Sequence, residues 1–236
     1  TRYSNSLSET QGFMIKTKLI AVTNPVVEGI EDAKDLLAFC ARISNPSNQF
    51  NMDTADKLVS YLLKYKHFSP FEMVNCVVEV ECPRDIARQL LRHRSFSFQE
   101  FSQRYADVTA LGDSFVIREA RMQDTKNRQN SVKTDNQELM LEWNVKQQEI
   151  LALVKEHYEW AISNNIAKEC ARVILPEGLT MSRLYVNGTI RSWLHYVEVR
   201  TEEGVTQQEH VELARLIAKV IAEAFPQITN FVKEPT

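Results

Sequence analysis

The stretch from Thr134 to about Asn164 predicts a single long amphipathic helix, and no other feature constrains the fold of this 236-residue chain as strongly. Its apolar residues recur at helical spacing. They are Leu139, Leu141, Val145, Ile150, Leu153, Val154, Trp160 and Ala161. Because the helix is longer than is usual in globular proteins, we expect it to form a spine of the domain or a contact between subunits.

Shorter strands and helices are predicted on both sides of this helix. The strands fall at 13–22, 73–80, 115–117 and 179–186, and the helices at 30–43, 54–65, 83–94, 189–199 and 207–225, with a short helical piece ending at 176. We expect a turn at Asn187-Gly188 and a surface loop over 120–135. The fold class is therefore α/β, of the α+β type: a mixed β-sheet flanked by helices, with a long helical spine, in a single intertwined domain over residues 14–236. The polar residues 1–13 are expected to be a flexible arm or an artificial remnant.

Composition excludes several classes of protein. The formal net charge is −3, with 28 Lys and Arg against 31 Asp and Glu, so the protein offers nucleic acid no general attraction. The four cysteines are scattered without a CxxC pair, as is typical of a reduced interior. The apolar run after Met14 is too short for export or for crossing a membrane. We expect a cytoplasmic protein that binds neither nucleic acid nor a membrane, and we assign no metal site.

Between Arg84 and Tyr105 the run RDIARQLLRHRSFSFQEFSQRY holds five arginines. Arg88 and Arg92 are four residues apart and Gln89 is three before Arg92, so the end of a helix can present guanidinium and amide groups to one ligand. Arginine forks match phosphate oxygens, which makes phosphates the expected ligands. A solvated cationic face that caps the helix end is the alternative. RNA binding through stacked phenylalanines is the least favoured interpretation.

Two further groups could join such a site. The turn HFSPFE at 67–72 carries a histidine, a hydroxyl and a carboxylate, either as a site-lining loop or as ordinary surface. Arg191 and His195 share one helical face, and Arg200 follows at the helix end, where an arginine can also be only a cap. The sequence contains no glycine-rich phosphate loop, HExxH or GxSxG motif, so side chains must hold whatever is bound.

The central run also resembles a known family. Arg92-His93-Arg94, seven intervening residues and then Ser102 resemble the RHRx₇S signature of the flavin-dependent thymidylate synthases, and the following Arg104-Tyr105 agrees. The HxSPFE turn at 67–72, the ARVILP segment at 171–176 and the RSWLHYVEVR segment at 191–200 follow in the family's order. The resemblance covers essentially residues 14 to 225.

That resemblance implies an enzyme that makes dTMP from dUMP. The methylene group would come from 5,10-methylenetetrahydrofolate, and the reducing equivalents from NADPH by way of FAD, without a cysteine nucleophile. The resemblance also implies a homotetramer with active sites shared between subunits. A flavin- or nucleotide-binding module without synthase activity is the alternative from a different class.

Carried over residue by residue, the resemblance implies two sets of contacts. Those with FAD are Ser69, Arg92, His93, Arg94, Ser95, Glu100, Thr189, Ile190, Arg191 and His195. Those with dUMP are Gln89, Leu90, Leu91, Arg92, Glu100, Phe101, Ser102, Gln103, Arg104, Arg172 and Arg200.

Roles follow for some of these residues. Arg200 would stabilise an ionised uracil, and Ser102 would position the nucleotide without attacking it. Arg104 and Arg172 would hold the phosphate. Arg172, Arg191 and Arg200 are expected to reach the Arg92 region from neighbouring subunits. Family members commonly have asparagine where Gln99, Thr189 and His195 stand, and the segment after Arg200 is one residue longer than usual.

Overall fold

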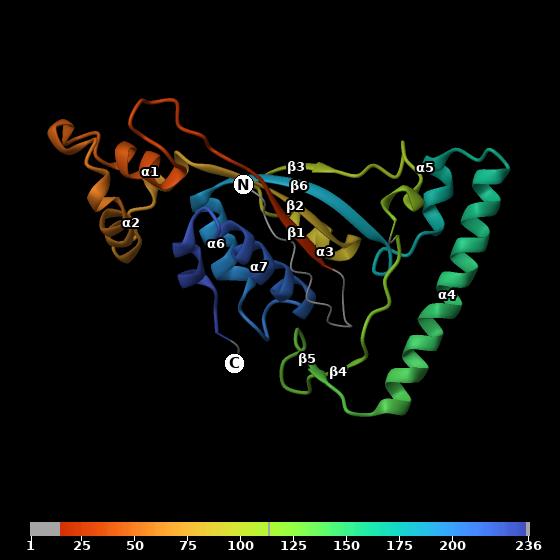
Figure 1. Cartoon of the computed structure of the whole chain (residues 1–236). Coiled ribbons are helices and arrows are strands. Elements are labelled where there is room, and N and C mark those ends of the chain that lie inside the picture. The colour runs from red at the N-terminus through yellow and green to blue at the C-terminus, as the bar shows by residue number, and fades with distance from the viewer. Residues whose placement is uncertain (1–14, 113, 235–236) are drawn as a thin grey trace.

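The computed structural model describes residues 15–112 and 114–234, so the arm predicted for residues 1–13 lies outside the described residues. The described residues form a four-stranded sheet in the order β1-β2-β6-β3 (Figure 1). Its strands are β1 (Lys16–Val22), β2 (Asn75–Pro83), β6 (Met181–Thr189) and β3 (Ser97–Glu100). The α+β class is confirmed. The ladders of this sheet are all antiparallel, however, so the sheet is not mixed as we expected.

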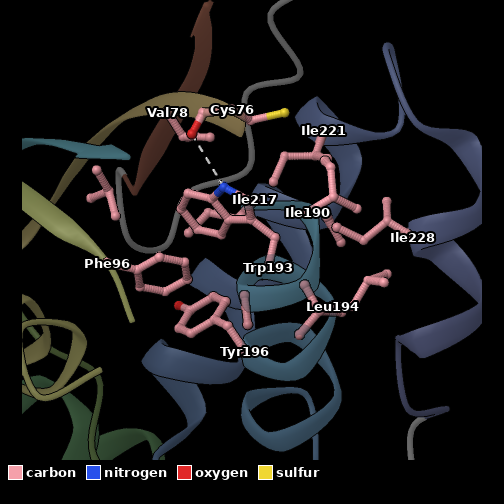
Figure 2. Close-up of a cluster of buried hydrophobic side chains, with 14 of the residues drawn as sticks. Cys76, Val78, Phe96, Ile190, Trp193, Leu194, Tyr196, Ile217, Ile221 and Ile228 are labelled. Carbon is pink, nitrogen blue, oxygen red and sulfur yellow. Dashed lines mark hydrogen bonds between the residues drawn. The ribbon is translucent and has the colours of Figure 1, made fainter. Parts of the chain in front are cut away.

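One face of the sheet carries the main core. In β2 the alternating residues Cys76, Val78, Val80 and Cys82 are fully buried, as a strand with one face on the core requires. The helices α6 (Ile190–Arg200) and α7 (Gln208–Ile221) pack with this face, on one side of the sheet. At the centre, Trp193 is buried and donates its Nε1 hydrogen to the Cys76 carbonyl at 3.3 Å (Figure 2). Burial of such a large side chain contributes about 1.5–3 kcal/mol.

Both helices predicted near the N-terminus are present, and each is shorter than predicted. They are α1 (Ala33–Ala41) and α2 (Ala55–Lys64). Asp32 caps α1 by accepting a hydrogen bond from the Asp35 amide at 2.8 Å. Thr54 precedes α2 as expected, but its hydroxyl accepts from Arg42 Nη2 at 2.8 Å and caps nothing. The HFSPFE turn then forms the 3-10 helix η3 (Ser69–Glu72), which contacts α6.

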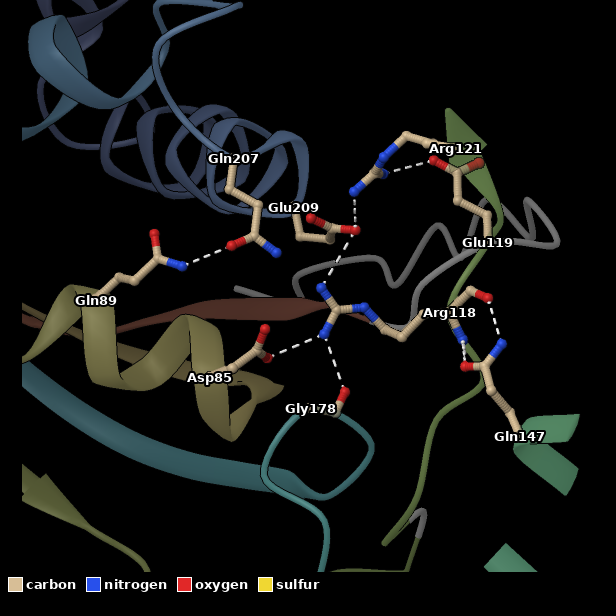
Figure 3. Close-up of polar contacts among 9 residues, drawn as sticks. All are labelled: Asp85, Gln89, Arg118, Glu119, Arg121, Gln147, Gly178, Gln207 and Glu209. Carbon is tan, nitrogen blue, oxygen red and sulfur yellow. Dashed lines mark hydrogen bonds and ion pairs between the residues drawn. The ribbon is translucent and has the colours of Figure 1, made fainter. Parts of the chain in front are cut away.

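The long predicted helix is α4 (Gln137–Ser163), followed by α5 (Lys168–Ala171) and the 3-10 helix η5 (Arg172–Ile174). Figure 1 shows α4 standing apart from the sheet, at the end of the molecule opposite α1 and α2. Few of its side chains are buried. Gln147 is one of them, and its amide pairs with both the N–H and the C=O of Arg118, each at 2.8 Å (Figure 3). No helix in the described ranges is long and apolar enough to cross a membrane.

Two local predictions are wrong. Asn187-Gly188 is not a turn, because β6 continues through both residues to Thr189. The glycine serves packing instead: a Cβ at Gly188 would lie 2.3 Å from Cδ1 of Phe96. The loop expected over 120–135 contains a hairpin of β4 (Arg121–Gln123) and β5 (Ser131–Lys133).

Two further elements differ from expectation. Residues 115–117 form no strand, and only an isolated bridge joins Phe115 to Thr180. The helix expected over 83–94 is α3 (Arg84–Leu90), which begins one residue after β2 ends. Its shorter length matters for the site, because the triplet that begins at Arg92 lies beyond the helix.

Candidate active site

The site begins where α3 ends. The Leu91 amide still donates to the Ala87 carbonyl, at 2.9 Å, and the chain then turns through residues 92–96 into β3. Arg92 and Arg94 are exposed in this turn, whereas His93 between them is half-buried. The turn therefore directs two guanidinium groups outward and one imidazole toward the protein.

His93 is held by Arg200, the last residue of α6. Arg200 Nε donates to His93 Nε2 at 2.9 Å, so Nε2 must be unprotonated and the ring neutral. Burial lowers the pKa of His93, and the charges of Arg200 and His195 lower it further, to about 4. Because only Nε of Arg200 is used, its two terminal nitrogens have no hydrogen-bond partner within the described residues. The contact also joins Arg200 to the RHR triplet within one chain, without a neighbouring subunit.

Some segments that carry residues expected at FAD come together around the start of α6, whereas Glu100, also expected at FAD, lies at the far end of β3. Arg191 forms an ion pair with Glu72 of η3, the helix that also carries Ser69. Ser192 Oγ donates to the Ser95 carbonyl at 3.5 Å. The turn through residues 92–96 therefore also contacts the start of α6. Arg191 therefore lies at the same end of α6 as this turn within one chain, next to Ser192. Three segments distant in sequence thus meet at one place.

This place fits a phosphate-bearing flavin cofactor in its donor chemistry. In the described part of the chain Arg92 and Arg94 are exposed and have no carboxylate partner, so both guanidinium groups can take a pyrophosphate. Thr189 is less available, because its hydroxyl accepts from the Ser192 amide at 3.2 Å and caps α6. FAD would be held here by Arg92, Arg94 and Arg191.

A second group of expected residues lies at the other end of β3. Glu100 Oε1 accepts from Ser182 Oγ at 2.9 Å and lies 3.4 Å from Arg84 Nη1. Ser102 Oγ accepts only a long hydrogen bond, 3.4 Å, from the Arg104 amide. It has no histidine or carboxylate partner within the described residues, which is consistent with a positioning role.

Arg104 and Arg172 belong to this second group. Arg104 Nε donates to Glu169 Oε2 of α5 at 3.2 Å, and Arg172 begins η5 three residues after Glu169. Phe101 continues the sheet, because its amide donates to the Arg183 carbonyl at 2.8 Å. The two arginines expected at the nucleotide phosphate therefore lie beside the same short helix.

The residues expected at dUMP fall into two groups, one at Arg200 and one at the far end of β3, and the described contacts do not join them. Across the described ranges no hydrogen bond or ion pair joins the pair His93 and Arg200 to the group of Glu100, Ser102 and Arg104. The strand register explains this, because β3 runs from Ser97 beside Asn187, near α6, to Glu100 beside Leu184, away from it. The expected substrate residues of one chain therefore lie in two separate groups.

Some expected contact residues turn their side chains into the core. Leu90 and Ile190 are fully buried, so in this structure their side chains cannot line a ligand. Leu91 is only partly buried, and packs against that core. Gln103 is also buried, and its amide nitrogen has no hydrogen-bond partner in the part of the chain described.

Gln89 has partners that the sequence did not indicate. Its Nε2 donates to Gln207 Oε1 at 2.7 Å (Figure 3), and its Oε1 lies 3.2 Å from Nδ1 of the buried His210. His210 could have been noticed, because it stands one helical turn before Ala214 on the buried face of α7. A histidine at such a position is a buried polar residue that needs partners.

The fold and this site define an α+β protein whose exposed arginines gather at both ends of β3. The family model described as thymidylate synthase complementing protein matches residues 25–227. A probable flavin-dependent thymidylate synthase of Paramecium bursaria Chlorella virus 1 is 47% identical over 216 residues, which cover 92% of this chain and 98% of that protein. The chain therefore belongs to the thymidylate synthase complementing protein family, that of the flavin-dependent thymidylate synthases.

Other known proteins agree. The flavin-dependent thymidylate synthase of Synechocystis sp. is 42% identical over 214 residues, covering 89% of this chain and 96% of that protein. A crystal structure of the UMP/dUMP methylase PolB from Streptomyces cacaoi, bound with 5-Br dUMP, matches with a TM-score of 0.73 at 24% identity. The match covers 92% of this chain and 93% of the PolB chain, and it shows that the two proteins share a fold.

Proposed function

We propose that this protein catalyses the reductive methylation of dUMP to dTMP. The one-carbon donor would be 5,10-methylenetetrahydrofolate, and the reductant FAD that NADPH has reduced. Family membership supports the enzyme class, and the observation that carries the proposal is the contact between His93 and Arg200 beside the exposed Arg92 and Arg94. The unit would be residues 14–236. A cytoplasmic location and the preference for NADPH stay predictions.

Arg200 would activate the uracil ring. Its Nε is fixed by neutral His93, which leaves the terminal nitrogens to donate to a uracil carbonyl on which negative charge develops. Such a fixed donor stabilises an enolate-like ring without reorganising during the reaction. FAD, when bound, supplies the reducing equivalents.

A cysteine nucleophile has no support in this chain. Burial raises the pKa of Cys76 to about 12, and burial also raises the pKa of Cys82, so both stay thiols at neutral pH. Cys170 is exposed, but it lies on α5 and no histidine is bonded to it among the described residues. The reaction would therefore proceed without a thiolate.

The nucleotide phosphate would be held by Arg104 and Arg172 of a different subunit from the one that provides Arg200. The separation of the two groups of expected substrate residues within one chain supports this arrangement, and a homotetramer would bring the groups of different subunits together. Apolar side chains on the outside of α4 supply an interface: Trp160 is 61% exposed and Leu141 67%. Trp160 also lines a cavity of about 680 Å³ between α4, α5 and η5.

Mixing two inactive variants tests the shared site. Arg104→Ala and Arg200→Ala should each abolish turnover alone. After the two proteins are unfolded together and refolded, activity should return in part, because some sites then combine both intact halves. Mixtures that stay inactive although hybrid tetramers form would contradict the sharing of sites.

The flavin spectrum tests ligand binding. The purified protein should be yellow, and its flavin absorption should change when dUMP is added, because the uracil would lie beside the flavin. Bound flavin whose absorption spectrum does not change when dUMP is added would favour a flavin-binding module over a synthase.

A further inference from the structure

His210 lies in a chain of hydrogen bonds that runs from Tyr196 through His210 and Gln89 to Gln207. The side chain of His210 is fully buried on α7, and both of its ring nitrogens have partners. Nε2 lies 3.1 Å from Tyr196 Oη, and Nδ1 lies 3.2 Å from Gln89 Oε1. Gln89 in turn donates from Nε2 to Gln207 Oε1 at 2.7 Å (Figure 3).

With Gln89 Oε1 facing His210, as in this structure, the hydrogen bonds of this chain have one consistent set of directions. An amide oxygen only accepts, so Nδ1 of His210 must carry the hydrogen that Gln89 Oε1 receives. Nε2 of a neutral ring is then an acceptor, and Tyr196 must donate to it. Burial lowers the pKa of His210, and the charges of Arg200 and His93 lower it further, to about 3, so the ring is neutral at neutral pH.

Gln89 is therefore held in one of its two amide orientations. Its oxygen is occupied by His210 and one hydrogen of Nε2 by Gln207. The second hydrogen of Nε2 has no hydrogen-bond partner among the described residues, so the amide can donate it to a ligand. A flipped amide would place an N–H group against the N–H of His210, which is unfavourable.

We propose that His210 is a positioning residue, which orients the Gln89 amide so that the free hydrogen of Nε2 meets the nucleotide. This rests on the proposed function, in which Gln89 contacts dUMP. Gln89 would then select an acceptor oxygen of the nucleotide, a carbonyl or a hydroxyl, and disfavour an amino group at the same place. The selection arises because a donor facing an amino group leaves both groups unpaired.

Two substitutions separate the positioning role from simple packing. An asparagine amide reaches about as far as Nδ1 of histidine, so His210→Asn can keep the hydrogen bond to Gln89. A glutamine amide reaches about as far as Nε2, so His210→Gln can keep the bond to Tyr196 but loses the one to Gln89. His210→Phe removes both bonds while it fills the space.

Calorimetric titration of dUMP into the flavin-loaded protein measures the effect without turnover. The dissociation constant should rise about fivefold in His210→Phe and His210→Gln, which corresponds to one lost hydrogen bond, and should stay near the wild-type value in His210→Asn. With Gln89→Ala already present, His210→Phe should add less than about twofold. Thermal unfolding of each variant shows that it is folded.

Equal losses in the asparagine and glutamine variants, or wild-type affinity in all three, would overturn the positioning role. A loss in His210→Phe that persists in the Gln89→Ala protein would also overturn it. Wild-type protein that fails to bind dUMP would instead contradict the proposed function, on which the positioning role depends.

Discussion

Arg200 donates a hydrogen bond from Nε to His93 Nε2 across 2.9 Å, although the two residues are 107 positions apart in the sequence. The contact closes α6 onto the turn that follows α3. Burial lowers the pKa of His93, and the contact with Arg200 lowers it further, so the ring is neutral; the contact also holds the Arg200 side chain in one orientation. A neutral imidazole can accept this bond, whereas an imidazolium would repel the guanidinium.

Arg200→Ala should lower the rate of dTMP formation by at least about 10²-fold, because a fixed donor at the developing charge is lost. Bound flavin should remain, since Arg92, Arg94 and Arg191 are unchanged. The pKa of His93 should rise, because the charge of Arg200 helps to lower it. Steady-state turnover and an NMR titration of the His93 ring measure the two effects. Near-normal turnover would remove Arg200 from the mechanism.

A protein without cysteines should still make dTMP. The combination Cys40→Ala, Cys76→Ala, Cys82→Ala and Cys170→Ser should cost about 1 kcal/mol of stability at each buried position, because Cys76 and Cys82 lie in the core. Turnover should nevertheless persist. Circular dichroism and flavin content establish that the variant is folded. A folded variant that binds flavin yet makes no dTMP would point to a thiolate mechanism.

Gly188→Ala should disturb the site through the core. The new Cβ would lie 2.3 Å from Cδ1 of Phe96, so the ring must move, and Phe96 lies two residues after the RHR triplet. We expect a loss of about 1–3 kcal/mol in the free energy of unfolding, as is usual for overpacking, together with weaker retention of FAD.

Gly178→Ala is the matched control, because no atom of the described residues, apart from its chain neighbours, lies within 4 Å of its added Cβ. Urea denaturation and flavin release compare the two proteins. Equal effects of both substitutions would contradict the packing role of Gly188.

Glu209→Gln should destabilise the protein at neutral pH. Burial raises the pKa of Glu209, but the opposing charges of Arg118 and Arg121 leave it below the ordinary value of 4.5 (Figure 3). Its charge therefore stabilises the fold above pH 4.5, and this contribution is lost as the pH falls through the folded-state pKa. Removing one member of a buried ion pair typically costs about 3–5 kcal/mol.

The difference in stability between wild-type protein and Glu209→Gln should shrink as the pH falls below 4.5. Glu212→Gln on the same helix is the control. Burial raises the pKa of Glu212, so neutralising this residue should not destabilise the fold. Denaturation across a pH series measures both. A pH-independent deficit in Glu209→Gln would contradict the electrostatic role.

Strong local periodicity made much of the fold predictable. The spacing of apolar residues predicted α4, and the alternation in β2 predicted a strand beside the core. β3 was missed because Ser97 and Gln99 face outward and only pairing with β6 defines the strand. The hairpin of β4 and β5 was missed for a similar reason, since polar bonds hold it. Asp124 is central there, and accepts from Lys126, Asn127 and Asn130.

The spacing of the RHR triplet and Ser102 indicated which arginines to expect at the site, and their role there stays a prediction. The partners of these arginines could not be predicted. The carboxylates that hold the cations, Glu72 for Arg191 and Glu169 for Arg104, are distant in sequence and leave no local pattern. The Asn187-Gly188 prediction failed because a turn signal and a packing requirement both select glycine.

Anaerobic turnover of dUMP with 5,10-methylenetetrahydrofolate and NADPH, with and without added FAD, tests the proposed reaction most directly. The proposed function predicts that dTMP forms, that its formation requires all three substrates, and that protein stripped of flavin regains activity when FAD is added. Absence of dTMP from flavin-loaded, folded protein, or turnover that is independent of FAD, would contradict it.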